Sequence, residues 1–477
     1  MKQLKVTLEE EIESRVDYLE KNHPTIFHRY KVKSKAGQLM YNKLNGLPKM
    51  NRSVLCEILL NIAKEYKLDF VPRTKKTNQI QTSLDFWKES IKGNVFIDVW
   101  TELADLCKKR QFVLKLEKPR IHPDYRTLVA TGRTSSHNPN IQQIPRDSIF
   151  RTLFTADEDY ILGIVDYSFI ELVTLAAVLE HKYGESKLGD VIRSGIDPHC
   201  YTAAMVYDMD IDNFMELAET QPENYKKWRQ SAKALNFGFP GGLGIKKFCI
   251  FAKSNYGVIF SEAQAQKFKQ KLIREVYPFL GKYLDDDGGK VLAKNLDCDE
   301  QLVKSMVQGK SGFNGAFRAV ENIVRGEPYK FTGEPYNEDY VNRIWNILNH
   351  LNNNPELVTP LAERDAGNWL QRKLMCRTTP LLTGRVRGGT SYTEDRNTPF
   401  QGLAADGAKL ALVNLFNAGF KLSIFVHDEI VTQLPLRDNP TELLKRQQQI
   451  MEEAMSEVIQ CDIPVKTEGV LSPVWTK

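Results

Sequence analysis

The chain has 477 residues, of which 42% are hydrophobic and 26% are charged. This length leaves room for several domains and this composition supports a packed core, which excludes a single small module and a mainly disordered chain. The longest largely apolar stretch, residues 172–179, is far shorter than the roughly 20 residues that a membrane-spanning helix needs, so no membrane partner is expected.

The charge is unevenly distributed along the chain. Residues 1–130 hold 25 Lys and Arg against 16 Asp and Glu, whereas residues 131–477 hold 40 against 44. A basic N-terminal quarter is typical of a protein with a polyanionic partner, although a lysine-rich solvated surface gives the same count. The seven cysteines form no Cys-x-x-Cys pair and the charged N-terminus lacks the apolar region of a signal peptide, so we expect a cytoplasmic location.

The N-terminal region is predicted to be mainly helical. Thr7 and Glu10 have the spacing of a capping box and predict a helix over residues 8–21. Apolar residues at helical spacing predict another over residues 52–66. The run FVLKLEK at residues 112–118 predicts a strand, and the composition then changes near residue 125 to Gly, Ser, Asn and Pro.

The rest of the chain mixes strands and helices. A continuous apolar run at residues 160–165 predicts a buried strand that stops at Asp166, and a helix is predicted over residues 170–180. Residues 212–238 are predicted to be helical up to Pro240 and its neighbouring glycines.

Near the C-terminus, two apolar runs at residues 422–426 and 429–434 flank His427 and Asp428. This pattern predicts a β-hairpin with two polar residues at its tip. A helix over residues 441–459 is predicted to follow it.

Two carboxylates, Asp166 and Asp428, each end an apolar strand. If the strands are neighbours in one sheet, the carboxylates come together, and paired Asp oxygens suit Mg²⁺, which takes one or two carboxylates plus waters and substrate phosphates. Two such ions support an in-line displacement at phosphorus. The alternative is that each Asp simply caps a turn.

Three residues in the predicted helix before Pro240 share one helix face. Arg229, Lys233 and Phe237 are spaced by four, so two cations and one ring point the same way. Such a face suits a triphosphate beside a nucleobase or sugar. The alternative is a solvated helix face with one core phenylalanine.

Six segments resemble, in the same order, the signature segments of the family A DNA polymerases. They are TGRTSSHNPNIQQIPR at 131–146, VDYSFIEL at 165–172, DPHCYTA at 197–203, RQSAKALNFGF at 229–239, NTPFQGLAAD at 397–406 and VHDEI at 426–430. The second, fourth and sixth resemble motifs A, B and C. Because a chance match of all six is negligible, the chain is identified as a member of this family, of the DNA polymerase I-like phage or bacterial type.

The resemblance implies an α/β fold with an α+β palm, arranged as a right hand of palm, fingers and thumb. The implied order is a thumb-like helical region leading into the palm at 1–130, a first palm segment at 131–190, fingers at 191–375 with an insertion at 286–375, and a second palm segment at 376–477. On this assignment we expect no 3'–5' exonuclease domain. A separate exonuclease or processivity protein is an expected partner, and the expected location is the cytoplasm of a bacterium or of a phage-infected host.

The resemblance also implies a function, template-directed DNA polymerase (a nucleotidyltransferase), with primer–template DNA and dNTPs as partners. Asp166, Asp428 and the backbone carbonyl of Tyr167 would hold two Mg²⁺ ions, for which Mn²⁺ can substitute, and Glu429 would tune this metal site. The implied catalytic and dNTP-binding residues are Arg229, Lys233, Phe237, His199, Ser168 and Glu171, the last as a steric gate against the 2' hydroxyl. The implied primer–template residues are Arg133, Gln401, Asn397, His427, Gln142 and Asn236.

The sequence departs from the family pattern at two positions. Gly241 stands where the family usually has a tyrosine, and Val173 where it often has an arginine. Two rival functions remain: a single-subunit RNA polymerase, against which Glu171 argues, and a catalytically silent nucleic-acid-binding protein, against which the retained Asp166 and Asp428 argue.

Overall fold

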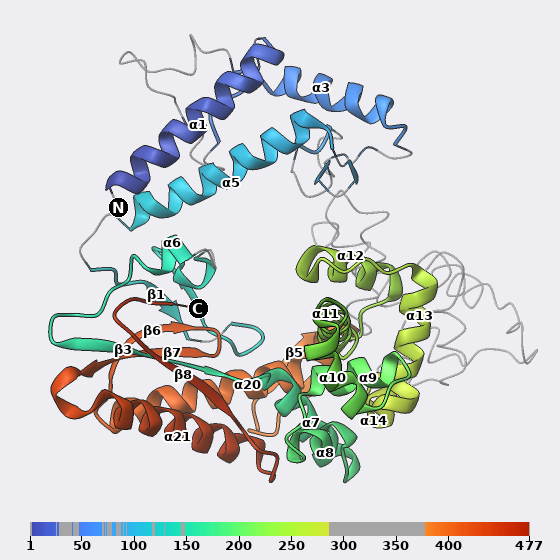
Figure 1. Ribbon diagram of the computed structural model, residues 1–477, viewed down its shortest axis with the longest axis vertical. Coiled ribbons are helices and arrows are strands. Elements are labelled where there is room, and N and C mark those ends of the chain that lie inside the picture. Colours follow the sequence, from blue (N-terminus) through green and yellow to red (C-terminus); the bar gives the residue numbers. More distant parts are fainter. Residues whose placement is uncertain are drawn as a thin grey trace, which may run out of the picture. The chain divides into compact units, whose positions relative to one another are not determined.

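The chain in this computed structural model divides into two compact units, one of residues 1–125 and 136–154 and the other of residues 126–135 and 155–476 (Figure 1). The structure describes residues 2–24, 26–27, 41, 47–68, 71, 73, 79–82, 87–88, 90–91, 93–116, 120–127, 129–144, 148–285 and 377–476. The predicted insertion at 286–375 lies outside the described residues.

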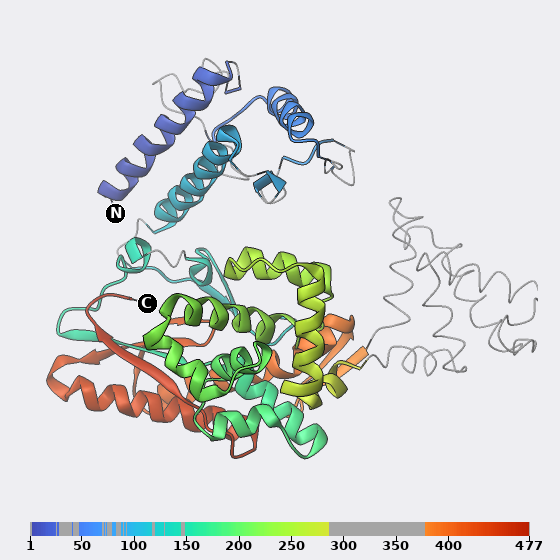
Figure 2. The same ribbon diagram turned by 45° about the vertical axis from the view of Figure 1, so that its right-hand side comes forward.

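The first unit is built on long helices. Its elements are α1 (Lys2–Asn22), α3 (Arg52–Glu65), α5 (Val95–Lys115), β1 (Asp124–Arg126), β2 (Ser135–His137), the 3-10 turn η1 (Ile141–Gln143) and α6 (Ser148–Arg151). Helices α1 and α5 pack side by side (Figures 1 and 2), and Arg110 Nη2 pairs with Glu9 Oε1 across them at 2.8 Å. Trp87 and Trp100 lie in the core that these helices share with α3.

Two predictions for this unit are wrong. Helix α1 begins at Lys2, so Thr7 lies inside the helix, where its Oγ1 donates to Gln3 O at 3.1 Å instead of capping. The first four residues of the predicted strand at 112–118 continue α5, and Val113 is fully buried. The hydrophobic pattern of a run of only seven residues, with apolar and charged side chains mixed, is the same for the end of a helix as for a strand.

An antiparallel sheet organises the second unit, with strand order β6–β7–β3–β8. The strands are β3 (Tyr160–Tyr167), β6 (Lys421–Val426), β7 (Glu429–Pro435) and β8 (Thr467–Ser472). The predicted strand before Asp166 and the hairpin around His427 and Asp428 are therefore confirmed. The hairpin pairs directly with the first strand although more than 260 positions separate them in the sequence.

Two long helices, α20 (Tyr392–Asn417) and α21 (Pro440–Ile459), pack against each other, and α21 packs on β3, β7 and β8 (Figures 1 and 2). Gln447 of α21 is fully buried: it accepts from Thr432 Oγ1 at 2.7 Å and donates to Ile430 O at 3.0 Å. The hydroxyl of Tyr167 donates to Met451 O at 2.6 Å. Because a buried polar side chain needs specific hydrogen-bond partners, the contacts of Gln447 and Tyr167 fix the position of α21 relative to the sheet.

The remaining helices of this unit form a second cluster. They are α7 (Ile170–Tyr183), α8 (Lys187–Arg193), α9 (Pro198–Val206), α10 (Ile211–Thr220), α11 (Pro222–Gly238), α12 (Ile245–Tyr256), α13 (Glu262–Lys271), the π-helical turn η2 (Leu272–Val276) and α14 (Pro278–Leu284). Helix α11 packs against α9, α10 and α12. A two-stranded sheet of β4 (Arg377–Pro380) and β5 (Val386–Thr390) packs on α20, and the 3-10 turn η4 (Leu436–Asp438) follows β7.

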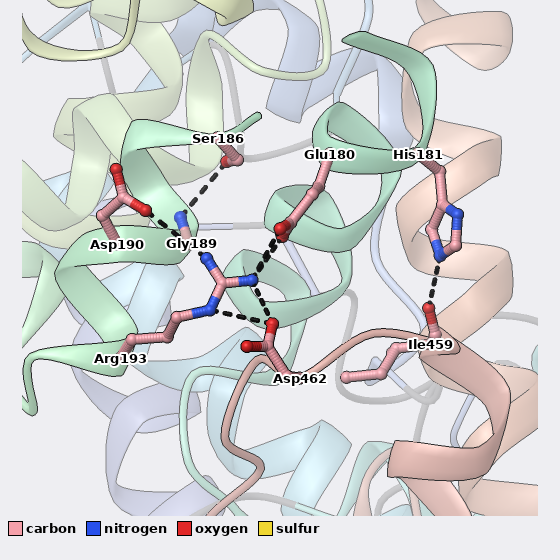
Figure 3. Close-up of polar contacts among 8 residues, drawn as sticks. All are labelled: Glu180, His181, Ser186, Gly189, Asp190, Arg193, Ile459 and Asp462. Atoms are coloured by element: carbon pink, nitrogen blue, oxygen red, sulfur yellow. Dashed lines mark hydrogen bonds and ion pairs between the residues drawn. The ribbon is translucent and has the colours of Figure 1, made fainter. Parts of the chain in front are cut away.

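Arg193, the last residue of α8, ties α7 and α8 to the segment after α21 (Figure 3). Its Nη2 contacts both carboxylate oxygens of Glu180 at 2.6 and 2.8 Å, and its Nε donates to Asp462 Oδ1 at 2.9 Å. Beside it, His181 Nε2 lies 2.8 Å from Ile459 O, the carbonyl of the last residue of α21. These contacts anchor α7, whose N-terminus carries Glu171, to the helix that supports the sheet.

Candidate active site

The strand register brings Asp166 next to the tip of the hairpin. In β3, Asp166 pairs with Glu429 of β7 on one side and with Glu468 of β8 on the other. Asp428 lies in the turn that leads into β7 and directly precedes Glu429, so the two aspartates predicted to act together lie one residue out of register at the ends of neighbouring strands. The prediction that adjacent strands bring them together is confirmed at the level of the backbone.

The turn between β6 and β7 has an unusual backbone. His427 is exposed and lies in the left-handed region at φ +59° although it is not a glycine. Such a conformation is uncommon for residues other than glycine, although Asn, Asp and His adopt it more often than the rest. The tight turn sets Asp428, which is half-buried, at the end of the strand pair.

Glu429 has a partner that the sequence did not reveal. It is 5% exposed and accepts a hydrogen bond from Trp475 Nε1 at 2.7 Å, and the Trp475 side chain is fully buried. A buried carboxylate needs such a donor. This contact orients Glu429 beside Asp166 and Asp428, which is compatible with the predicted indirect effect on a metal site.

The donor set fits Mg²⁺ held by few protein ligands. Within the described ranges, no group of three or more His, Cys, Asp or Glu side chains is arranged to enclose a metal ion. Mg²⁺ does not need such a cage, because it keeps waters and substrate phosphates around one or two carboxylates. Asp166 and Asp428, with the backbone carbonyl of Tyr167, are the residues that would hold it.

Arg133 and Glu171, predicted to act separately on the primer end and the sugar, contact each other. Arg133 Nη2 forms an ion pair with Glu171 Oε1, and the two side chains are 40% and 20% exposed. Glu171 lies in the first turn of α7. Local sequence patterns do not reveal this contact, because 38 positions separate the two residues.

Gly132, the residue before Arg133, has no side chain, and the guanidinium of Arg385, the residue before β5, lies close to its backbone. It lies at φ +87°, and a Cβ there would lie 2.1 Å from Arg385 Nη2. Arg385 in turn contacts both carboxylate oxygens of Asp406 in α20 at 3.1 and 3.2 Å. The loop that carries Arg133 is thereby held against α20, and any side chain at position 132 would displace Arg385.

Helix α11 presents the predicted cationic face. Pro222 occupies its first turn and Ala232, Ala234 and Leu235 are fully buried, whereas Arg229, Lys233 and Phe237 are half-buried. The three side chains therefore lie on the less buried side of the helix, as their spacing predicts. Phe237 stacks parallel to Tyr256, with ring centroids 6.3 Å apart.

Arg229 is held by a carboxylate that the sequence analysis did not single out. Asp197 caps α9, accepting from His199 N at 2.7 Å through Oδ1, and its Oδ2 accepts from Arg229 Nε at 3.2 Å. Burial raises the pKa of Asp197, but the Arg229 guanidinium outweighs it and leaves the pKa below its usual range. Asp197 thus stays ionised and links the start of α9 to the middle of α11.

Burial also affects the other charged groups at this face. Desolvation lowers the pKa of Lys233, and the nearby charge of Arg229 lowers it further. A site that already holds two crowded cations is stabilised when an anion binds. This electrostatic arrangement favours a polyphosphate ligand.

Asn236 requires a correction. It is 3% exposed, and its amide contacts Pro198 O and His199 Nδ1 at 3.3 and 3.1 Å. It therefore has no surface for the predicted primer–template contact in this structure. Since its partners come from α9, 34 or more positions earlier, no local pattern reveals them.

Gly241, where the family usually has a tyrosine, is buried against α20. A Cβ at this position would lie 2.5 Å from both Asn397 Nδ2 and Asn397 Oδ1. Asn397 Nδ2 donates to Gly241 O at 3.2 Å and to Thr393 O at 2.8 Å. Asn397 therefore occupies the space beside the end of α11 and connects it to α20.

We expect Gly241→Ala to lower the free energy of unfolding by about 1–3 kcal/mol, because the new methyl group must displace the Asn397 amide from its two acceptors. Urea denaturation measures this loss. In an Asn397→Ala background the same change should cost clearly less. Gly244→Ala is the matched control, since nothing lies within 4 Å of a Cβ there; equal losses at both glycines would contradict the contact.

The other predicted residues lie on several different elements of the two units. Gln401 is half-buried on α20, one helical turn after Asn397. Ser168 follows β3, and its Oγ donates to Glu468 Oε1 at 3.3 Å. Gln142 lies in the first unit, where its backbone NH donates to Asn140 Oδ1 at 3.2 Å and to Ser136 Oγ at 3.3 Å.

No helix in the described part of the chain is long and apolar enough to cross a membrane. Residues 8–296 match the model of the family described as DNA polymerase family A. The chain is 27% identical to DNA polymerase I of Aquifex aeolicus over 432 residues, which are 87% of this chain and 57% of the relative. It is 26% identical to a thermostable DNA polymerase I of Thermus filiformis over 86% of this chain and 40% of the relative.

The fold is similar to a solved structure, the POL domain of Pol1 from M. smegmatis in complex with a DNA primer–template and dNTP. The TM-score is 0.58 at 18% identity, with 99% of this chain and 66% of that chain covered. The two DNA polymerase I relatives are longer than this chain, which spans about half of their length. Since the family model covers more than half of the chain, the protein belongs to DNA polymerase family A.

Proposed function

We propose that this chain is a template-directed DNA polymerase that adds deoxynucleotides to a primer 3' end. The observation that supports the proposal is the pairing of β3 with β7, in which Asp166 pairs with Glu429, the residue after Asp428, in a chain of DNA polymerase family A. In the proposed reaction the 3' hydroxyl oxygen bonds to the α-phosphorus of a dNTP, and the bond to the β-phosphate breaks to release pyrophosphate. The palm, fingers and thumb assignments by residue range belong to this proposal.

Asp166 and Asp428 would hold two Mg²⁺ ions. When bound, such a pair lowers the pKa of the attacking hydroxyl and stabilises charge on the leaving oxygen. The chain's own contribution would be to fix Asp166 at the end of β3 and Asp428 in the turn before β7, with Glu429 oriented by its hydrogen bond from Trp475. A preorganised pair needs no rearrangement when the substrate arrives.

The cations of α11 would bind the triphosphate. Arg229 can exchange its contact with Asp197 for a phosphate oxygen, and Lys233 supplies a second positive charge one turn further along the helix. Phe237 would pack on the nucleotide from the same face. Gln401, Asn397, His427 and Gln142 remain proposed contacts to primer–template DNA.

Sugar selection is assigned to Glu171, next to Arg133. We expect Glu171→Ala to raise the ratio of ribonucleotide to deoxyribonucleotide incorporation by at least about tenfold, because it removes the bulk that would meet a 2' hydroxyl; about 1.4 kcal/mol of lost discrimination suffices. Steady-state incorporation of matched rNTP and dNTP measures the ratio.

Glu171→Gln is the control for this prediction, because it keeps the side-chain volume and removes the charge that pairs with Arg133. Its ratio should stay near that of the wild type. A rise of equal size in both variants would assign selection to the ion pair instead of to the bulk, and no rise in Glu171→Ala would place the gate elsewhere.

Proofreading is not part of the proposal for this chain. A separate exonuclease is the proposed source of proofreading, and a separate processivity protein is a further proposed partner. The experiment that tests the proposed function is primer extension by the purified chain with Mg²⁺, comparing dNTPs with rNTPs. Extension with dNTPs supports it; preferred use of rNTPs would favour the RNA polymerase alternative, and binding without extension would favour a silent DNA-binding protein.

A further inference from the structure

A buried hydrogen-bond network connects α9, α11 and the residue after η2. Asn236 Oδ1 accepts from Thr202 Oγ1 at 3.1 Å, and the Tyr277 hydroxyl lies 3.0 Å from Thr202 Oγ1. Thr202, Asn236 and Tyr277 are each no more than 3% exposed. Because water does not reach these groups, each must find its partner inside the protein.

The carbonyl of Pro198 fixes which way the Asn236 amide points. This oxygen carries no proton, so the atom 3.3 Å from it must be the donor Nδ2. If the amide were turned round, Asn236 Oδ1 would face Pro198 O, which has no proton to donate, and the NH₂ group would face Thr202 Oγ1. The observed orientation satisfies both sides of the amide.

His199 then has only one neutral form that fits. Asn236 Nδ2 lies 3.1 Å from His199 Nδ1, so Nδ1 must accept and the ring proton must sit on Nε2. Burial lowers the pKa of His199 to about 4; Asp197 opposes this shift, while Arg229 and Lys233 add to it. The imidazole is therefore neutral at neutral pH.

The ring of His199 faces the cationic side of α11. It packs on Phe237, with ring centroids 5.5 Å apart. Among the described residues, no hydrogen bond involves Nε2, and the network uses only Nδ1. A donor is thus kept available next to Arg229 and Lys233.

We propose that Asn236 is a positioning residue that holds neutral His199 as the Nε2–H tautomer, so that the imidazole offers a hydrogen-bond donor beside Arg229 and Lys233. The ligand class that matches two cations and a neutral donor is a polyphosphate. This identification of the ligand as the dNTP triphosphate rests on the proposed function; the tautomer assignment does not. A neutral donor binds phosphate without first taking up a proton.

Long-range ¹H–¹⁵N spectra of the full chain, labelled at histidine, test the tautomer directly at neutral pH. The His199 signals are assigned by their loss in His199→Gln. We expect the pattern of a neutral Nε2–H ring in the wild type and a mixture of tautomers in Asn236→Leu. An Nδ1–H or imidazolium pattern in the wild type would overturn the proposal, even if Asn236→Leu does not fold, and so would an unchanged pattern in that variant.

A second experiment measures the Kd of the same proteins for the next correct dNTP, in complex with a primer–template whose primer ends in a dideoxynucleotide. The Kd should rise about three- to tenfold in Asn236→Leu, because a hydrogen bond to a charged group is partly lost. Asn255→Leu is the matched control, an exposed asparagine of α12 that contacts only Phe251 O. A Kd unchanged in Asn236→Leu would overturn the phosphate role of the donor.

Failure of the proposed function has a different signature. A wild-type chain that binds no dNTP and yet shows the Nε2–H pattern would contradict the polymerase assignment and support the role of Asn236 in fixing the tautomer. The wild-type spectrum and the wild-type Kd therefore decide the two claims separately.

Discussion

Replacing Asp166 or Asp428 by alanine is expected to reduce the rate of primer extension at least about a thousandfold, because each carboxylate would hold a metal ion that contributes several kcal/mol to transition-state stabilisation. Affinity for primer–template should change by less than about threefold, since in the proposed site the carboxylates would hold metal ions and not the duplex. Single-turnover extension gives the rate, and fluorescence anisotropy of labelled primer–template gives the Kd.

Asp438→Ala is the matched control, because Asp438 is a carboxylate at the opposite end of the same strand, in the turn η4 after β7, and its side chain is 52% exposed. It should extend primers at nearly the wild-type rate. Substantial extension by either the Asp166 or the Asp428 variant would remove that residue from the metal site, and a loss of equal size in Asp438→Ala would show that the effect is on folding.

The second large effect is expected from the cationic face of α11. Arg229→Ala and Lys233→Ala should each lower kcat/KM for dNTP about ten- to a hundredfold, because each removes a charge-assisted contact to the triphosphate worth about 1.5–3 kcal/mol. Arg229→Ala also leaves Asp197 without its partner, so we expect an additional loss of stability in that variant. Initial-rate kinetics with varied dNTP measure the loss.

Lys226→Ala is the control on the same helix. Lys226 is 73% exposed and lies 3.9 Å from Glu223, on the same side of α11 as Lys233 but two turns, about 10 Å, earlier along the helix. Its removal should change kcat/KM less than about threefold. If Lys226→Ala were as impaired as Lys233→Ala, a diffuse positive field and not a localised triphosphate site would account for both.

Patterns within short stretches of the sequence predicted the strands and helices that position the site. The apolar run before Asp166, the hairpin around His427 and Asp428, and the helix that carries Arg229, Lys233 and Phe237 are all present. These succeed because strand and helix periodicity, turn residues and Pro240 are local signals. Which side chains act on the substrate stays a prediction.

Contacts between distant segments could not be predicted in the same way. The ion pair of Arg133 with Glu171 and the hydrogen bond from Trp475 to Glu429 join positions that no periodic pattern connects. Asn236 matches the family pattern by position, but its amide forms hydrogen bonds inside the protein, so the role assigned from position alone is wrong. Helix α5 shows the same limit for local structure, because packing extended a helix through residues that resemble a strand.

The central claim is that this chain copies a DNA template through the site formed by Asp166 and Asp428. The most direct measurement is incorporation of a single dNTP by the purified chain on primer–templates that differ only in the templating base, with Mg²⁺ present. The account predicts that the complementary dNTP is strongly preferred at each of the four bases and that incorporation is lost in Asp166→Ala. Incorporation that ignores the templating base, or that persists without Asp166, would contradict it.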